Sequence, residues 1–137
     1  MTSREALTHF LATDFPQCKC EVEQCGRQGA TVRRRIGEPD LRPGGTVSGP
    51  VMMEVADTAL YVALLAEIGI VPMAVTTSLT INYLRKPSAT RDLIGVCRLL
   101  KVGRTLAMGE VTLYSDGDPA PVAHATGTYA IPPQAGH

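Results

Sequence analysis

Two carboxylates stand in the most apolar segment of the chain, which runs from residue 44 to 65 as GGTVSGPVMMEVADTALYVALL. They are Glu54 and Asp57. Burying a carboxylate without a partner is costly, so an apolar helix rarely carries one by accident. A carboxylate in a cleft can activate a water molecule or attack a carbonyl carbon directly. Asp57 is therefore a candidate catalytic group, with an exposed side chain or one bonded to a strand hydroxyl as the alternative.

The entry to this apolar segment reads Ser48-Gly49-Pro50, and it can also take part in carbonyl chemistry. The first turn of a helix has free N–H groups and a partial positive charge, which suit an oxygen that is becoming negative. Pro50 has no N–H and fits the first helical turn, so the Gly49 N–H is the donor of interest. The alternative is that Ser48 only caps the helix.

Other side chains on the same helix are candidates to line one pocket with Asp57. Glu54 can be a second carboxylate of the site or a solvent-facing residue, and we favour the second interpretation. Thr58 and Tyr61 can contact a substrate, although packing in the core is equally expected for them. The histidines lie elsewhere and none is assigned to catalysis: they are His9, His124 and His137.

A sheet must cover this helix, because hydrophobic side chains surround it almost completely. Before the apolar helix the sequence predicts a short helix at 2–12, capped by Thr2 or Ser3, and a loop at 38–46. The apolar helix itself is expected to end near Gly69. No helix separates the later strands, so we expect them to pair as an antiparallel meander. The order predicts an α+β domain in which about six antiparallel strands wrap around one long central helix. Residue alternation predicts these strands at 18–26, 30–36, 74–85, 92–102, 105–115 and 121–131.

Length and charge limit the classes of protein. The 137 residues fit one domain over 1–137, with a flexible tail from about residue 132. Thirteen basic residues balance thirteen acidic ones, which argues against binding nucleic acid or a membrane surface through bulk charge. The start of the chain lacks the apolar stretch of a signal peptide, and no apolar segment reaches the roughly 20 residues of a membrane span. We expect a cytoplasmic protein.

The cysteines do not have the spacing of a metal site. Cys18 and Cys20 share one face of a strand, and Cys25 and Cys97 follow further along the chain. Zinc sites typically show paired C-x-x-C units or cysteines with histidines close by. We therefore expect free, partly buried thiols and no metal.

Three segments at consistent spacing resemble the hotdog-fold acyl-CoA thioesterases, in particular the phenylacetate-pathway (PaaI) and 4-hydroxybenzoyl-CoA types. Members of that family typically read His-Gly-Gly at the helix entry, with an acidic residue nine positions after the His. Here Ser48-Gly49-Pro50 and Ala56-Asp57-Thr58 keep this spacing. INYLRKP at 81–87 and KVGRTLAMGEV at 101–111 are similar to two further family segments, and the resemblance covers roughly residues 30–131.

The resemblance implies a hotdog fold and hydrolysis of an acyl-CoA or aryl-CoA thioester without a cofactor. It implies that Asp57 is the general base or nucleophile and that the Gly49 N–H polarises the thioester carbonyl. Thr76 or Thr77 would face an Asp and its water; in the family this Asp belongs to a partner subunit, and the sequence leaves open whether Asp57 and Thr76 of one site come from the same chain. The assembly implied is a homodimer or a dimer-of-dimers tetramer with active sites between subunits.

The chain also departs from the family pattern at the helix entry. Ser48 replaces the His, Pro50 replaces the second Gly, and Arg42 stands where Asn or Gln is frequent. These changes motivate an alternative, a hotdog protein that binds a thioester without cleaving it. The acyl group, and the choice between CoA and a carrier protein, are left open by the sequence.

Basic residues at strand ends and in a tight turn could meet the phosphates of CoA, as residues at such places do in the family. A solvated rim is an equally good interpretation of them. We interpret the run at 33–35, Arg33, Arg34 and Arg35, as hairpin surface. The candidates for substrate contact are Arg42, Pro50, Glu54, Thr58, Tyr61, Arg85, Lys86, Lys101 and Arg104.

Overall fold

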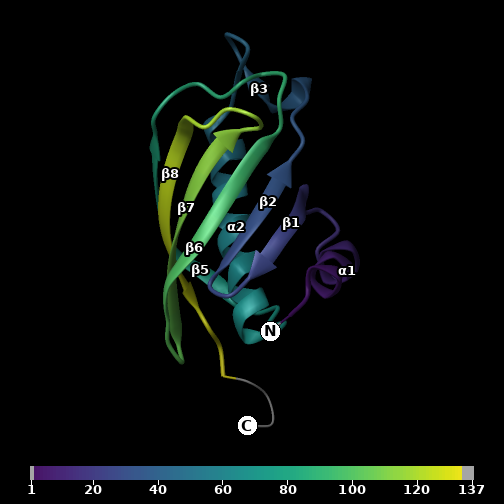
Figure 1. The fold of residues 1–137 in the computed structure, drawn as a ribbon, viewed down its shortest axis with the longest axis vertical. Coiled ribbons are helices and arrows are strands. Elements are labelled where there is room, and N and C mark those ends of the chain that lie inside the picture. The colour runs from purple at the N-terminus through teal and green to yellow at the C-terminus, as the bar shows by residue number, and fades with distance from the viewer. Residues whose placement is uncertain (1, 134–137) are drawn as a thin grey trace.

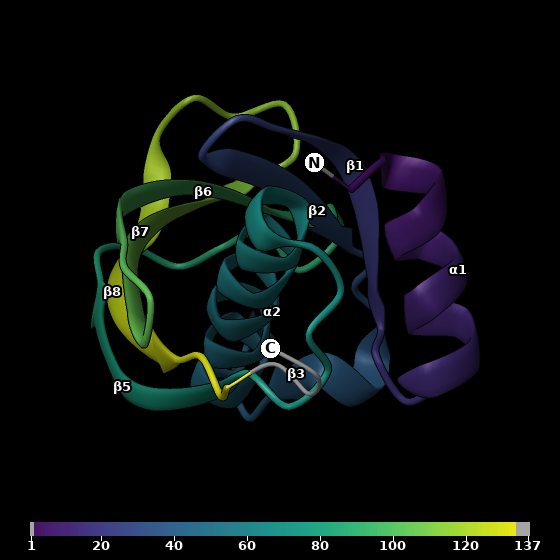
Figure 2. The same ribbon diagram turned by 90° about the horizontal axis from the view of Figure 1, so that it is seen from below.

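Six antiparallel strands curve around one long helix in the computed structural model, which describes residues 2–133 (Figure 1). The order across the sheet is β1-β2-β6-β7-β8-β5. The central helix α2 spans Gly49–Ile68 and lies within the concave side of the sheet (Figure 2). The predicted α+β architecture is confirmed. The strands are Cys20–Gly26 (β1), Gly29–Arg34 (β2), Val75–Tyr83 (β5), Leu93–Val102 (β6), Leu106–Ser115 (β7) and Pro121–Ala130 (β8).

The sequence signals at both ends of α2 act as expected. The Ser48 hydroxyl accepts a hydrogen bond from the Val51 N–H at 3.4 Å, which satisfies one free donor of the first turn. Pro50 stands in that turn, where its missing N–H costs nothing. The helix ends at Gly69, whose φ of 100° is accessible mainly to glycine.

Glycines in the sheet let α2 pack closely against it. Leu60 is 2% exposed and lies over the middle of β7 and β8. A Cβ atom at Gly109 would come within 2.7 Å of one Leu60 methyl group, and a Cβ at Gly127 within 2.5 Å of the other. Any larger residue at these positions would force the helix away from the sheet.

One predicted strand pairing is wrong. We expected the last four strands to pair in chain order, and β6, β7 and β8 do so. However, β5 pairs with β8, while β6 pairs with β2 on its other side. The chain therefore crosses the helix between β5 and β6, which no local signal reveals. As a result β5 forms one edge of the sheet, with mostly exposed side chains.

The first helix, α1, spans Arg4–Asp14 and lies outside the sheet beside β1 (Figure 2). It begins and ends two residues later than predicted. Its cap is Ser3, whose hydroxyl accepts from the Ala6 N–H at 3.1 Å. The helix buries Leu7, Phe10 and Leu11, which join the core. It therefore covers the β1 side of the molecule.

The segment before α2, predicted as a loop, contains short regular pieces. A 3₁₀ turn, η1, spans Glu38–Asp40, and β3 (Leu41–Arg42) pairs with β4 (Thr46–Val47). The Ser48 N–H donates to the Asp40 carbonyl at 3.0 Å. This bond ties the segment to the start of α2.

The cysteines are free thiols, as predicted: Cys20 and Cys97 are buried, and Cys18 and Cys25 are half-buried. Within residues 2–133 no group of three His, Cys, Asp or Glu side chains is placed to hold a metal ion. The same part of the chain has no helix long and apolar enough to cross a membrane. The predicted flexible tail falls mainly on residues 134–137, which lie outside the described residues.

Candidate functional site

The Asp57 carboxylate is held on one side by two hydroxyl groups. Its Oδ1 accepts from Thr76 Oγ1 at 2.5 Å and from the Tyr129 hydroxyl at 2.7 Å. Burial raises the pKa of Tyr129 far above its usual value, and the negative charge of Asp57 raises it further, so this hydroxyl stays protonated and donates. Within residues 2–133 no donor bonds Oδ2, which leaves that oxygen available to water or substrate.

Asp57 lies in a cleft of about 430 Å³ between α1, α2 and the start of β5. The helix α2 contributes residues spaced by three or four positions, which share one face. The three predicted neighbours of Asp57 on α2 all line this cleft. The lining residues are Phe10, Asp14, Phe15, Glu54, Asp57, Thr58, Tyr61, Pro72, Ala74, Val75, Thr76 and Tyr129.

The structure distinguishes between the two threonines at the start of β5. Thr76 points to Asp57, whereas Thr77 is exposed and donates to the Thr128 carbonyl at 3.3 Å. The register against β8 shifts between Thr76 and Ser78, so Thr77 is the extra residue of a β-bulge. Thr76 is therefore the hydroxyl that belongs to the Asp57 cleft.

A second groove, also of about 430 Å³, lies at the entry of α2. The Tyr83 hydroxyl donates to the Gly49 carbonyl at 3.2 Å. A Cβ at Gly49 would lie 3.0 Å from that hydroxyl oxygen, so the position favours glycine. Ser48 caps the helix. Predicted substrate contacts that line the groove are Arg42, Arg85 and Lys86.

Gly49 and Asp57 do not meet in one chain. They stand eight residues apart on the same helix, and a rise of 1.5 Å per residue separates them by about 12 Å along its axis. A single carbonyl group cannot contact both. Asp57 lies toward the start of β5, through Thr76, and Gly49 lies toward its end, through Tyr83.

The basic candidates divide between the two ends of the sheet. Arg85 and Lys86 follow the end of β5 and line the Gly49 groove. Lys101 and Arg104 flank the turn between β6 and β7 and line neither the Asp57 cleft nor the Gly49 groove. This turn lies at the end of the sheet where β5 begins, because Val75 and Leu106 both pair with Ala130.

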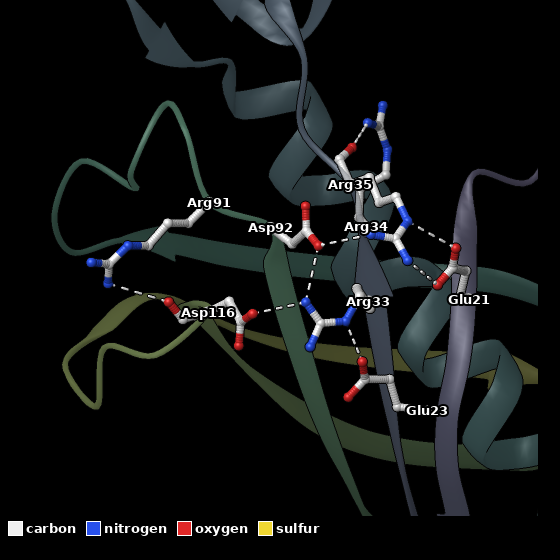
Figure 3. A network of polar contacts seen from close by, with 8 residues as sticks. All are labelled: Glu21, Glu23, Arg33, Arg34, Arg35, Arg91, Asp92 and Asp116. Atoms are coloured by element: carbon white, nitrogen blue, oxygen red, sulfur yellow. Dashed lines mark hydrogen bonds and ion pairs between the residues drawn. The ribbon is translucent and has the colours of Figure 1, made fainter.

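The prediction that three adjacent arginines lie on the surface is wrong for Arg34. Arg33 and Arg35 do point outward, where Arg33 meets Glu23, Asp92 and Asp116 (Figure 3). Arg34 is only 4% exposed. Successive side chains of a strand point to opposite faces, so the middle arginine of the three must point inward.

Arg34 pairs with two carboxylates beneath the sheet. Its guanidinium donates to both oxygens of Asp40, each at 3.0 Å, and to Glu54 at 3.4 Å. The guanidinium holds the pKa of Asp40 below its usual value. Glu54 lines the cleft and pairs with Arg34, and with 35% of its side chain exposed it also reaches solvent.

Several residues of the cleft region were not predicted, among them Tyr129 and Arg34. Tyr129 lies 72 positions from Asp57, and no local pattern connects them. Arg34 had a signal, because it alternates in phase with the buried residues Ala30 and Val32. Neither described histidine lines the cleft: His9 is on α1 and His124 bonds Glu110, while His137 lies outside the described residues.

Comparison with known proteins identifies the family. The model of the Thioesterase superfamily matches residues 44–122, more than half of the chain, including the entry of α2 and Asp57. The chain belongs to the thioesterase superfamily. The hotdog thioesterase resemblance seen in the sequence is thereby confirmed. A search of curated protein sequences found no matching relative.

Solved structures of the superfamily share the fold closely. A protein from Silicibacter sp. TM1040, provisionally described as a thioesterase, is 44% identical with a TM-score of 0.90, over 97% of this chain and 94% of that one. Zebrafish thioesterase superfamily member 2 is 20% identical with a TM-score of 0.84, over 96% and 100% of the two chains. The E. coli PaaI protein is 17% identical with a TM-score of 0.76, over 93% and 97%. The last two likenesses show the fold alone.

Proposed function

We propose that this superfamily member hydrolyses an acyl-CoA or aryl-CoA thioester, with Asp57 as the catalytic carboxylate. The proposal rests on the hydrogen bonding of the Asp57 carboxylate. Thr76 and Tyr129 fix one carboxylate oxygen, the other accepts from no donor within residues 2–133, and Asp57 lines a cleft large enough for an acyl group. A fixed carboxylate with one free oxygen is suited to act as a general base or as a nucleophile.

The reaction breaks the bond between the acyl carbon and the CoA sulfur. In one route Asp57 takes a proton from water, whose oxygen attacks the acyl carbon. In the other route Asp57 attacks first and the resulting anhydride is hydrolysed. In both routes the carbonyl oxygen gains negative charge, for which the Gly49 N–H is the proposed donor. The thiolate of CoA leaves and takes a proton, and no cofactor is needed.

The proposed site needs two copies of the chain, because Gly49 and Asp57 lie about 12 Å apart on one helix. The free edge of β5 supports a way to combine them. If β5 pairs antiparallel with its copy about Thr80, Tyr83 of one chain lies opposite Thr77 of the other and one residue away from Thr76. The Gly49 end of one helix then lies beside Asp57 of the partner helix.

The same pairing would gather the basic candidates. Arg85 and Lys86 belong to the Gly49 end of β5, and Lys101 and Arg104 to the Asp57 end. Two antiparallel copies of β5 would bring Arg85 and Lys86 of one chain and Lys101 and Arg104 of the other to each site. Four cations at one mouth suit the phosphates of CoA. Such a dimer also covers the unpaired edge of β5.

The direct test is a panel of acyl- and aryl-CoA thioesters with a thiol reporter, applied to wild type and to Asp57→Asn in the presence of a metal chelator. We expect turnover by wild type and a fall in kcat of about 100-fold or more for the variant. Glu38→Gln is the matched control, because Glu38 is an exposed acid outside both grooves. Equal rates for wild type and Asp57→Asn would exclude Asp57 as the catalytic group.

The second candidate function is binding of a thioester without cleavage. It rests on the helix entry, where Ser48 serves as a cap and Pro50 lacks an N–H. Isothermal titration that detects a CoA ester, with turnover at background across the whole panel, would support it. A rate that depends on Asp57 would eliminate it.

A further inference from the structure

The cleft beside Asp57 has an aromatic wall that extends away from the sheet edge. Tyr129 stacks on Tyr61 with ring centroids 6.0 Å apart, and Tyr61 in turn meets Phe10 and Phe15, each at 6.3 Å. These rings lead from Asp57 to α1. An acyl group whose carbonyl lies at Asp57 therefore extends along this wall toward the α1 end of the cleft.

Two further carboxylates line the same cleft, Glu54 from α2 and Asp14 from the end of α1. Burial raises the pKa of the Tyr61 hydroxyl, and the charge of nearby Asp14 raises it further. Among the described residues that line the cleft there is no lysine, arginine or histidine. The cleft thus combines aromatic surface with negative charge.

Arg34 does not cancel this charge. Its single guanidinium is shared between Asp40, which it binds through both oxygens at 3.0 Å, and Glu54, which it meets at 3.4 Å. Two carboxylates and one guanidinium leave one net negative charge in this group. The Glu54 side chain is 35% exposed, so its carboxylate lies at the cleft surface, and the buried Arg34 side chain lies behind it.

We propose that Glu54, assisted by Asp14, selects the acyl group by charge: the cleft accepts acyl groups whose far end is neutral or cationic and rejects those that end in a carboxylate. This inference rests on the proposed thioesterase function. A carboxylate on the substrate would approach like charges in surroundings less polar than water, where their repulsion is strengthened. A cation would be attracted both by the carboxylates and by the faces of the aromatic rings.

The test compares three thioesters that share a six-carbon acyl chain and differ in the charge at its far end: hexanoyl-CoA, adipoyl-CoA and 6-(trimethylammonio)hexanoyl-CoA. Desolvation penalises both charged substrates, so the sign of the preference between them isolates the effect of the carboxylates. For wild type we expect kcat/KM for the cationic substrate to exceed that for adipoyl-CoA by at least about tenfold. We expect the difference to lie mainly in KM and to narrow at high salt.

Variants then assign the selectivity to residues. Glu54→Gln keeps the shape and removes the charge, so we expect the cation-to-anion ratio of kcat/KM to fall severalfold. Glu54→Lys should lower the ratio further, and Asp14→Asn should lower it less. Glu38→Gln, an exposed acid outside the cleft, should leave it unchanged.

The outcomes separate this inference from the proposed function. Hydrolysis of hexanoyl-CoA with equal use of the two charged substrates, or a ratio unaffected by Glu54→Gln, overturns the charge selectivity and leaves the function standing. If no thioester is cleaved, the proposed function fails. In that case, titration with the corresponding CoA thioethers, which cannot be hydrolysed, decides the charge selectivity through the same preference in Kd.

Discussion

The two edges of the sheet differ in how they are covered. At one edge β1 is flanked by α1, and its glutamates pair with arginines in or just after β2: Glu23 with Arg33 and Glu21 with Arg35 (Figure 3). At the other edge β5 is uncovered, with Val75 54% exposed and Tyr83 48% exposed. Both ends of β5 contact α2 at the candidate catalytic groups. The difference indicates that the chain uses its own helix to protect one edge and keeps the other for a partner and for chemistry.

This comparison predicts two kinds of failure. Loss of the buried ion pairs on the β1 side, which form within one chain, should lower the stability of the fold. Changes along β5 should leave each chain folded and remove turnover or assembly.

The largest effect on stability is expected for Arg34→Met. The change leaves Asp40 and Glu54 as buried or half-buried carboxylates without their cation, and we expect the free energy of unfolding to fall by about 3 kcal/mol. Urea unfolding followed by circular dichroism measures it. Arg35→Met is the matched control, because the Arg35 side chain is 71% exposed, and it should cost under about 1 kcal/mol. Equal losses for the two variants would contradict a special role of the inner arginine.

On the β5 side, Thr76→Val should reduce turnover with little loss of stability. It removes one of the two hydroxyl donors that fix Asp57 Oδ1, and we expect kcat to fall about tenfold. Thr77→Val is the neighbouring control, since the Thr77 hydroxyl donates to a strand carbonyl and not to Asp57. Steady-state kinetics on both variants tests the assignment. A larger loss for Thr77→Val would show that the wrong threonine has been placed in the site.

A smaller effect is expected for Thr80→Glu, which tests the pairing of two β5 strands. In the proposed register each new glutamate faces its own copy, and we expect like-charge repulsion of about 1 kcal/mol to weaken the dimer roughly fivefold. Gln24→Glu adds the same charge to β1, where it should not alter assembly. Sedimentation over a range of concentrations measures both. A dimer of unchanged affinity in Thr80→Glu would argue against this register.

Sequence analysis succeeded where the information is local. The ends of α2, the positions of the strands and the spacing between Gly49 and Asp57 follow from caps, alternation and the family motif. It failed where contacts join distant segments. The pairing of β5 with β8 and the contact of Tyr129 with Asp57 depend on how the sheet closes around the helix, which no short pattern records.

Arg34 illustrates a different kind of failure. Residue type and alternation gave conflicting indications, because arginines are mostly exposed whereas the period of the strand pointed this one inward. The strand period was the better guide, since Asp40 supplies a bidentate partner. That partner comes from the segment that was predicted as a plain loop, so the compensation was invisible in the sequence.

The packing of Leu60 against Gly109 and Gly127 has a consequence for the rate of the proposed thioester hydrolysis. These contacts fix the position of the helix on the sheet, because sliding or rotating the helix would make Leu60 clash with the strands. The position of the helix fixes where the Gly49 N–H and the Asp57 carboxylate lie relative to the sheet edge. It therefore also fixes how the helices of two chains must be placed for these groups to meet. A larger residue at Gly109 or Gly127, although remote from any substrate, would displace the helix and lower the activity of both sites of a dimer together.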